Sequence, residues 1–320
     1  MINNLQVLRA FAALNVVMFH IIGIAHVYDH NVVLLAPLSG WGKNGVDIFF
    51  VISGFVMGYS QLQNPKPWRQ FLLGRIVRIV PIYWLLTFVF VCIYVLAPGL
   101  IERVVLTPEY VLSSLLFIAA LGFEAPVLDV GWTLEWEMLF YVIFGVCLTI
   151  GSARAAIGGA ISFMVVLILF LDMWLLLEFI YGLIAALLFL GIKHSKRTSM
   201  ALFLLGAVGL VAVIFISQPI HRAFVLGIPS FFLVWGAAGL WQTRNQIALY
   251  LGASSYSIYL IQVFSIPAFY KIIDLLDLQI QADVLALLCM IVTAIAGCIF
   301  YSLVERSITQ KLRKTVRTSS

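Results

Sequence analysis

Runs of apolar residues dominate the chain, and polar residues are mostly confined to short stretches between them. A helix needs about 20 apolar residues to cross the hydrocarbon core of a bilayer. Runs that approach this length cover residues 5–26, 46–62, 77–97, 132–150, 156–171, 173–191, 199–216, 223–241, 248–270 and 284–304. The pattern predicts an all-α fold, a polytopic membrane bundle of about ten transmembrane helices.

A weaker apolar segment covers residues 109–122 and is only about 14 residues long, which favours a re-entrant or interfacial helix over a crossing. The positions of lysine and arginine test this interpretation, because cytoplasmic loops collect them. With both termini inside, every basic residue falls on the inner side except Lys43, Arg103, Arg222 and Lys271. A crossing at 109–122 would place the stretch "KHSKR" and the basic C-terminal segment outside, so we reject it.

Composition agrees with this picture, since 63% of the residues are hydrophobic and 10% are charged, against about 45–50% and 25% in soluble domains. The ten spans nearly exhaust the 320 residues, which leaves one membrane domain at 1–306 and a basic cytoplasmic tail at 307–320. The net charge of +5 is explained largely as a topology signal, and we expect no nucleic-acid partner. Small residues on several helices are compatible with a homodimer.

Ionisable groups inside spans are costly and mark candidate functional sites. His20 lies in the first span, about 16 Å along the helix from Arg9. A neutral imidazole satisfied by a neighbouring helix is the structural alternative for His20, and snorkelling to the inner surface is the alternative for Arg9.

Two later spans bring acidic groups to their outer ends. Asp47 starts the second span in "GKNGVDIFFVISGF", where Gly54 and Gly58 have the small-xxx-small spacing of touching membrane helices; such packing would hold Asp47 and Ser53 firmly. The stretch "DVGWTLEWEMLFY" carries Asp129, Glu135 and Glu137. Glu135 and Glu137 point to different faces of a helix, so we expect at most one of them near His20. Stabilisation by the helix dipole is the structural alternative for these carboxylates.

Arg75 and Arg78, in "GRIVRIVPIYW", share one helix face at the inner end of the third span. Guanidinium forks match phosphate oxygens, so the pair favours an anionic ligand from the cytoplasm, and ordinary positive-inside flanking is the alternative. In the stretch "LGASSYSIYLIQ" we interpret the serines as packing residues and retain Tyr256 as a substrate contact. We find no metal-ligand cluster in the sequence and expect no metal.

These stretches, in their order, resemble the acyltransferase 3 family of integral-membrane O-acyltransferases, whose members acylate exported or surface glycans. The similarity rests on "LRAFAALNVVMFH", "NGVDIFFVISGF", "GRIVRIVPIYW", "GWTLEWEMLFY", "LGASSYSIYLIQ" and "YSLVER", and it is greatest to stand-alone exopolysaccharide O-acetyltransferases. The resemblance implies a catalytic role for His20, binding of acyl-coenzyme A by Arg75 and Arg78, and the motif glutamate at Glu137, with Trp132 at the start of that motif. Gln262 and Ser307 depart from residues common in the family.

We therefore predict an enzyme of the bacterial cytoplasmic membrane that moves an acetyl or short acyl group from acyl-coenzyme A to a polysaccharide or a lipid-linked precursor. The assigned catalytic residues are His20, Glu137 and Asp47; the donor-binding residues are Arg75, Arg78 and Arg9; and the substrate-binding residues are Trp132, Tyr256 and Ser53. His20 could act as a general base or carry the acyl group. The rival hypothesis is a transporter of a lipid-linked sugar or a proton-coupled permease, with the buried charges, Glu178 among them, as a proton relay. A noncatalytic subunit is a third alternative.

Overall fold

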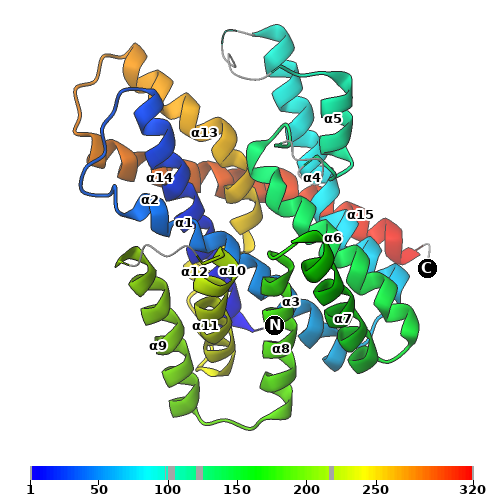
Figure 1. Ribbon diagram of the computed structural model, residues 1–320. Helices are drawn as coiled ribbons and strands as arrows, with labels where there is room; N and C mark the ends of the chain where they lie inside the picture. The colour runs from blue at the N-terminus through cyan, green and yellow to red at the C-terminus, as the bar shows by residue number, and fades with distance from the viewer. Residues whose placement is uncertain (1, 98, 100–104, 120–124, 216–219, 319–320) are drawn as a thin grey trace.

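The computed structural model describes residues 2–97, 99, 105–119, 125–215 and 220–318. The regular structure of these described residues is helical, and they contain no strand. The helices (Figure 1) are α1 Asn3–Val27, α2 Leu38–Trp41, α3 Asn44–Gln63, α4 Trp68–Leu96, α5 Pro108–Leu115, α6 Trp132–Cys147, α7 Ala153–Leu171, α8 Leu176–Gly191, α9 Lys196–Ala212, α10 Arg222–Val225, α11 Gly227–Gly239, α12 Gln246–Ala253, α13 Ser255–Leu275, α14 Ala282–Phe300 and α15 Arg306–Thr318.

The predicted polytopic bundle is confirmed. Nine helical segments of the described chain are long and apolar enough to cross a membrane, and α8 is a shorter apolar helix of 16 residues. The orientation of the termini stays a prediction, and Arg103 lies outside the described residues.

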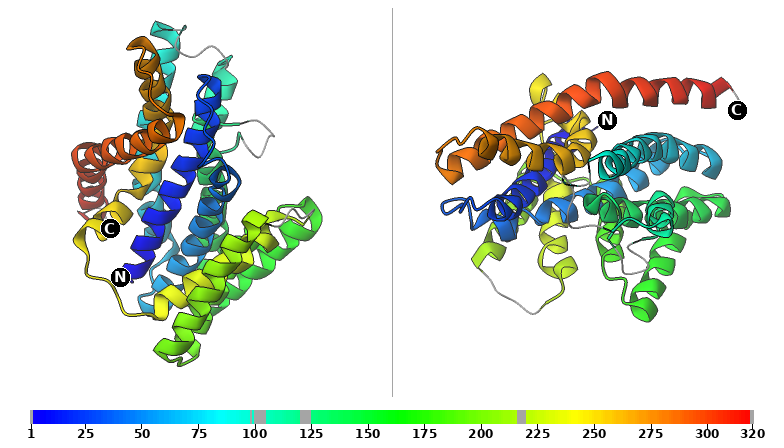
Figure 2. Two further views of the ribbon diagram at one scale, coloured as in Figure 1. Left: turned by 90° about the vertical axis from the view of Figure 1, so that its left-hand side faces the viewer. Right: turned by 90° about the horizontal axis from the view of Figure 1, so that it is seen from above.

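Three details differ from the hydropathy pattern. The third span begins at Trp68 rather than at residue 77. The run at 248–270 is divided at Ser254, between α12 and α13. The basic segment after residue 306 is helical, and α14, a π-helical turn at Tyr301–Glu305 and α15 together form one long rod along an edge of the bundle (Figure 2).

The weak apolar segment is too short to cross the bilayer. Its helix, α5, has eight residues and packs back against α4. The hydroxyl groups of Tyr83 and Ser114 are 2.7 Å apart, and Trp84 Nε1 donates to the Leu115 carbonyl at 2.9 Å. These contacts reach the middle of α4, which agrees with a re-entrant helix; positions 120–122 of the predicted segment lie outside the described residues.

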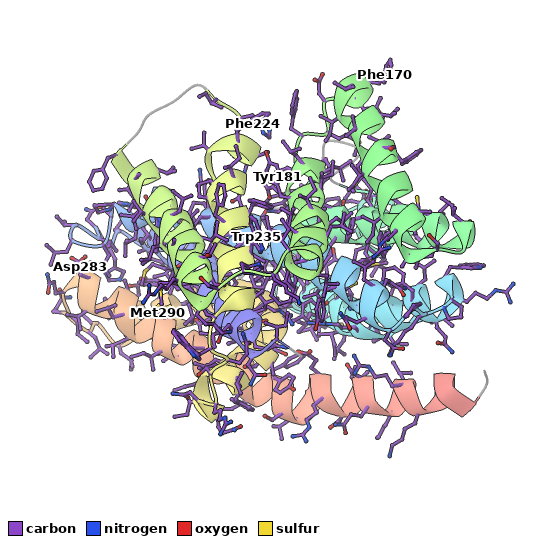
Figure 3. All side chains as sticks on the ribbon, turned by 90° about the horizontal axis from the view of Figure 1, so that it is seen from below. Phe170, Tyr181, Phe224, Trp235, Asp283 and Met290 are labelled. Atoms are coloured by element: carbon purple, nitrogen blue, oxygen red, sulfur yellow. The ribbon has the colours of Figure 1, made fainter. Side chains whose placement is uncertain are left out.

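Helix α3 lies among α1, α8 and α11, and α1 also contacts α12, α13 and α14. Apolar side chains cover the outside as well as the inside of the bundle: Phe170, near the end of α7, projects outward and is 79% exposed (Figure 3). An apolar exterior suits lipid because hydrocarbon chains, unlike water, do not disfavour it. The buried polar groups that remain inside are therefore the ones that require an explanation.

Gly54 and Gly182 let α3 and α8 touch, as the glycine spacing predicted for α3. A Cβ atom on Gly54 would lie 2.2 Å from the Phe179 carbonyl oxygen, and one on Gly182 would lie 2.2 Å from the Val51 carbonyl oxygen. Such overlaps involve backbone atoms and force the two helices apart. This contact fixes the depth and rotation of the residues that α3 presents to the interior.

We expect Gly54→Val to lower stability by about 1–3 kcal/mol, the usual cost of overpacking. The readout is the thermal unfolding midpoint of the purified protein in detergent. Gly23→Ala is the matched control, since a Cβ there meets nothing within 4 Å, and its midpoint should not fall. Equal midpoints for wild type and Gly54→Val would contradict the proposed tight contact.

Candidate active site

A cavity with about 770 Å³ of space between atoms, part of it open to solvent, lies where α1, α3, α4, α6 and α13 meet. Its polar lining comes from all five helices and consists of Arg9, Ser53, Arg75, Arg78, Thr133, Glu137, Tyr141, Ser255, Tyr256 and Tyr259. Six of the predicted site residues are thus brought together: Arg9, Ser53, Arg75, Arg78, Glu137 and Tyr256. The other three, His20, Asp47 and Trp132, do not line this cavity.

Three guanidinium groups converge on the cavity, Arg9 from α1 and Arg75 and Arg78 from α4. No carboxylate of the described residues forms an ion pair with any of them. The Arg75 guanidinium lies 5.9 Å from the centroids of both the Phe71 and Tyr141 rings, and its buried Nε has no hydrogen-bond partner among the described residues. A buried donor without a partner is costly, so this cluster is suited to an anionic ligand that accepts its hydrogen bonds.

Glu137 forms the acidic part of the wall. Its Oε1 accepts hydrogen bonds from the Ser53 hydroxyl at 2.6 Å and from the Tyr141 hydroxyl. Tyr141 lies one helical turn after Glu137, on the same face of α6. Glu135 is buried on a different side of α6 and interacts electrostatically with Tyr83, as expected for residues two positions apart. The carboxylate of Glu137 is therefore held in place by α3 and by its own helix.

Tyrosine hydroxyls hold α13 to the helices opposite. Tyr256 donates to the Ile79 carbonyl at 2.8 Å, and Tyr259 donates to the Val130 carbonyl at 2.7 Å. The Thr133 hydroxyl lies 2.7 Å from that of Tyr259. Trp132 instead packs edge-on against Phe50, with ring centroids 6.4 Å apart. Tyr256 is thus buried with its hydroxyl satisfied, and what it can offer a ligand is the face or edge of its ring.

His20 lies on α1, the helix that carries Arg9, and about 16 Å of helical rise separates the two residues. Its ring packs edge-on against Phe19, with centroids 5.0 Å apart. Among the described residues, Asp129 is a charged group that acts on His20 electrostatically. Asp129 also acts on Tyr259, which lines the cavity. In the part of the chain that the structure describes, the hydrogen bonds of Glu137 go to Ser53 and Tyr141 and those of Asp47 go to Arg222, and none of them joins either carboxylate to the His20 imidazole.

Asp47 is engaged elsewhere. Its fully buried carboxylate accepts two hydrogen bonds from Arg222, from Nη2 at 2.6 Å and from Nε at 3.1 Å, and Nη2 also donates to the Lys43 carbonyl at 3.2 Å. Glu178 of α8 is buried beside this pair and interacts with Asp47. The cluster joins α3, α8 and α10, and its three charged side chains do not line the cavity.

We expect Arg222→Ala to lower stability by roughly 3 kcal/mol, because it leaves the Asp47 carboxylate buried without its partner. Intrinsic fluorescence during thermal unfolding in detergent measures this loss. The double variant Asp47→Asn/Arg222→Gln, which removes both charges together, should recover much of the midpoint. A single variant as stable as wild type would contradict a structural role for this ion pair.

Several residues of the site were not predicted from the sequence. Tyr141 could have been found from its spacing to Glu137, and Tyr259 from its position one turn after Tyr256. Glu305 is buried at the π-helical turn, accepts the Ser257 hydroxyl at 2.5 Å, and interacts electrostatically with Arg9 and Arg78. It belongs to the stretch "YSLVER", but no local signal shows that a π turn directs it toward the arginines.

Comparison with known proteins agrees with the resemblance found in the sequence. The profile of the acyltransferase 3 family, described as an acyltransferase domain, matches residues 2–303. The exopolysaccharide production protein ExoZ of Rhizobium meliloti (strain 1021) is 32% identical over 297 residues, covering 85% of this chain and 91% of ExoZ. No solved structure matches significantly. The chain is a multi-pass membrane protein that belongs to the acyltransferase 3 family.

Proposed function

We propose that this acyltransferase moves an acetyl or similar short acyl group from acyl-coenzyme A to a hydroxyl of an exported polysaccharide or its lipid-linked precursor, in the bacterial cytoplasmic membrane. The observation that carries the proposal is the convergence of Arg9, Arg75 and Arg78 on one cavity without ion-pair partners among the described residues. Phosphate groups are anions that guanidinium forks bind in bidentate geometry. The printed name of the similar protein ExoZ, an exopolysaccharide production protein, supports a polysaccharide acceptor.

In the proposed reaction the donor phosphates bind the three arginines at the inner end, and the thioester reaches toward His20. The acceptor hydroxyl attacks the thioester carbonyl, a C–O ester bond forms, and the C–S bond breaks. His20 takes the proton of the hydroxyl and returns a proton to the thiolate, so no net proton is gained or lost. Asp129 orients the imidazole and stabilises its protonated form.

A second route uses the same residues in two steps. The His20 imidazole first accepts the acyl group, which releases the thiol, and the acceptor hydroxyl then takes the acyl group from the imidazole. In both routes we assign Glu137 and Ser53 to positioning the substrate between the arginines and His20, and the Tyr256 ring to its contact surface. Asp47 acts indirectly, because its pair with Arg222 holds the α3 helix that carries Ser53.

The decisive experiment supplies purified protein with acetyl-labelled acetyl-coenzyme A and a non-acetylated exopolysaccharide. We expect alkali-labile label on the glycan, since ester bonds are cleaved by mild base. The transporter alternative predicts no labelled glycan, but movement of a lipid-linked sugar or a proton-coupled solute across the membrane of proteoliposomes. Label transfer without any such flux supports the acyltransferase, whereas flux without label transfer refutes our proposal.

A further inference from the structure

A second hollow lies outside the candidate active site, with about 860 Å³ of space between atoms and open solvent. Its walls are the loop between α3 and α4, with Lys66; the first residue of α4, Trp68; and the turn that follows α6, with Thr149 and Gly151. The φ angle of Gly151 is +96°, which a residue with a side chain adopts only at a cost. We call this hollow the loop groove.

The loop groove is lined by ends of helices that also enclose the cavity. Three helices contribute to both: α3 through Met57 and Gln61, α4 through Arg75 and Trp68, and α6 with its C-terminal turn through Tyr141 and Leu148. Trp68 lies seven residues before Arg75, about 10 Å of helical rise. The Phe71 ring, with the Arg75 guanidinium 5.9 Å from its centroid, lies between these two positions on α4. A ligand that has its phosphates on Arg75 and Arg78 and also occupies the loop groove would have to pass the Phe71 ring, which packs against Tyr141 and Phe144.

Side-chain hydrogen bonds stabilise the turn that carries Lys66. The buried side chain of Gln61 accepts a hydrogen bond from the Lys66 N–H at 2.7 Å and donates one to the Lys66 carbonyl at 3.2 Å. These bonds use the backbone of Lys66, so its ammonium group is left to interact with other groups. The exposed side chain of Lys66 thus places a positive charge at the rim of the loop groove.

Trp68 provides the flat surface of the loop groove. Its side chain is 40% exposed, and the Arg69 guanidinium lies 5.3 Å from its ring centroid. An indole with a cation on one face and open space beside it suits stacking of a heteroaromatic base, since purines stack on aromatic rings irrespective of sequence context. A tryptophan at a helix end also fits the aromatic belt at a membrane interface, but a belt residue requires no adjoining groove or basic rim.

We propose that the loop groove binds the adenosine end of the acyl donor, with the purine stacked on Trp68 and a phosphate near Lys66. The proposal rests on the function proposed above, in which acyl-coenzyme A is the donor. It divides the donor into two parts: the nucleotide in the loop groove, and the phosphate and thioester-bearing arm in the cavity. The two parts can be tested separately because coenzyme A can be shortened at either end.

The test is calorimetric titration of purified protein in detergent with coenzyme A, adenosine 3′,5′-bisphosphate and 4′-phosphopantetheine. We expect Trp68→Ala to weaken binding of coenzyme A and of adenosine 3′,5′-bisphosphate about tenfold, the effect of losing one stacked base. Binding of 4′-phosphopantetheine, which lacks the base, should be unchanged. Trp68→Phe should restore most of the lost affinity. Lys66→Ala, which keeps the backbone hydrogen bonds of the turn, should weaken the two nucleotides and spare 4′-phosphopantetheine.

Trp241→Ala is the matched control, because Trp241 is an exposed tryptophan outside the loop groove that the topology prediction places near the same membrane face. It should bind all three probes as wild type does. Equal weakening of all three probes by Trp68→Ala, or wild-type affinities in both Trp68→Ala and Lys66→Ala, would overturn the assignment of the loop groove alone. A wild-type protein that binds no coenzyme A would refute the donor in the proposed function, and the groove assignment with it.

Discussion

His20→Ala should lower the rate of acyl transfer by a factor of about 10²–10⁴, the usual contribution of a general base, and by more if the imidazole carries the acyl group. The imidazole is the base that the proposed reaction needs, and Asp129 acts on it electrostatically. The measurement is the initial rate of label transfer from acetyl-coenzyme A to glycan. Coenzyme A affinity should stay near the wild-type value, because His20 lies about 16 Å of helical rise from Arg9.

His26→Ala is the matched control for this variant. His26 lies six residues later on α1, in the last turn of the helix, and is exposed. Its variant should transfer acyl groups at the wild-type rate. Near-normal product from His20→Ala, with the protein folded as judged by size-exclusion chromatography, would remove His20 from the mechanism.

The two routes through His20 differ in what happens without an acceptor. If the imidazole carries the acyl group, wild-type protein incubated with labelled donor alone and quenched rapidly should retain label, and His20→Ala should not. If the imidazole acts only as a base, neither protein should retain label. This comparison decides between the routes without any knowledge of the acceptor.

Arg75→Ala and Arg78→Ala should each weaken coenzyme A binding by roughly 10- to 150-fold, the equivalent of losing a hydrogen bond to a charged group at about 1.5–3 kcal/mol. The expected kinetic signature is a raised KM for acetyl-coenzyme A with a smaller change in kcat, because these residues contact the phosphates rather than the reacting carbonyl. Arg75→Lys should fall between wild type and Arg75→Ala, since an ammonium keeps the charge but loses the planar fork.

Arg197→Ala controls for loss of a positive charge. Arg197 is an exposed residue in the first turn of α9 and does not line the cavity. Its variant should bind coenzyme A as wild type does at moderate ionic strength, where distant surface charges are screened. Unchanged affinity in both Arg75→Ala and Arg78→Ala would show that the donor phosphates bind elsewhere.

Hydropathy predicted the spans well because each crossing helix satisfies its backbone hydrogen bonds within its own segment. In two places the helix boundaries differ from the boundaries of the apolar runs. The division at Ser254 interrupts a continuous apolar run, and there the Ser254 hydroxyl bonds the Tyr250 carbonyl at 2.9 Å. Helix α4 begins at Trp68, well before its apolar run, and the stretch from Trp68 to Arg75 is helical although it contains polar residues.

The candidate site also combines features that a local pattern predicts with features that depend on helix packing. Residues of one helix at a spacing of three or four positions, such as Arg75 with Arg78 and Glu137 with Tyr141, share a face whatever the rest of the chain does. The sequence alone was therefore sufficient for the paired arginines and for the separation of Glu135 from Glu137. It was also sufficient to mark His20 and Asp47 as polar residues that a span must accommodate.

Which of these groups meet depends on helix packing across long stretches of chain. Asp47 and Arg222 are 175 positions apart and form a bidentate pair, a contact that no local pattern encodes. The close approach at Gly54 and the π turn that includes Glu305 set the rotation of their helices, and rotation determines which side chains face the cavity. Local periodicity specifies the face of each helix, whereas the pairing of faces is fixed by steric fit and by the need to satisfy charges buried away from water.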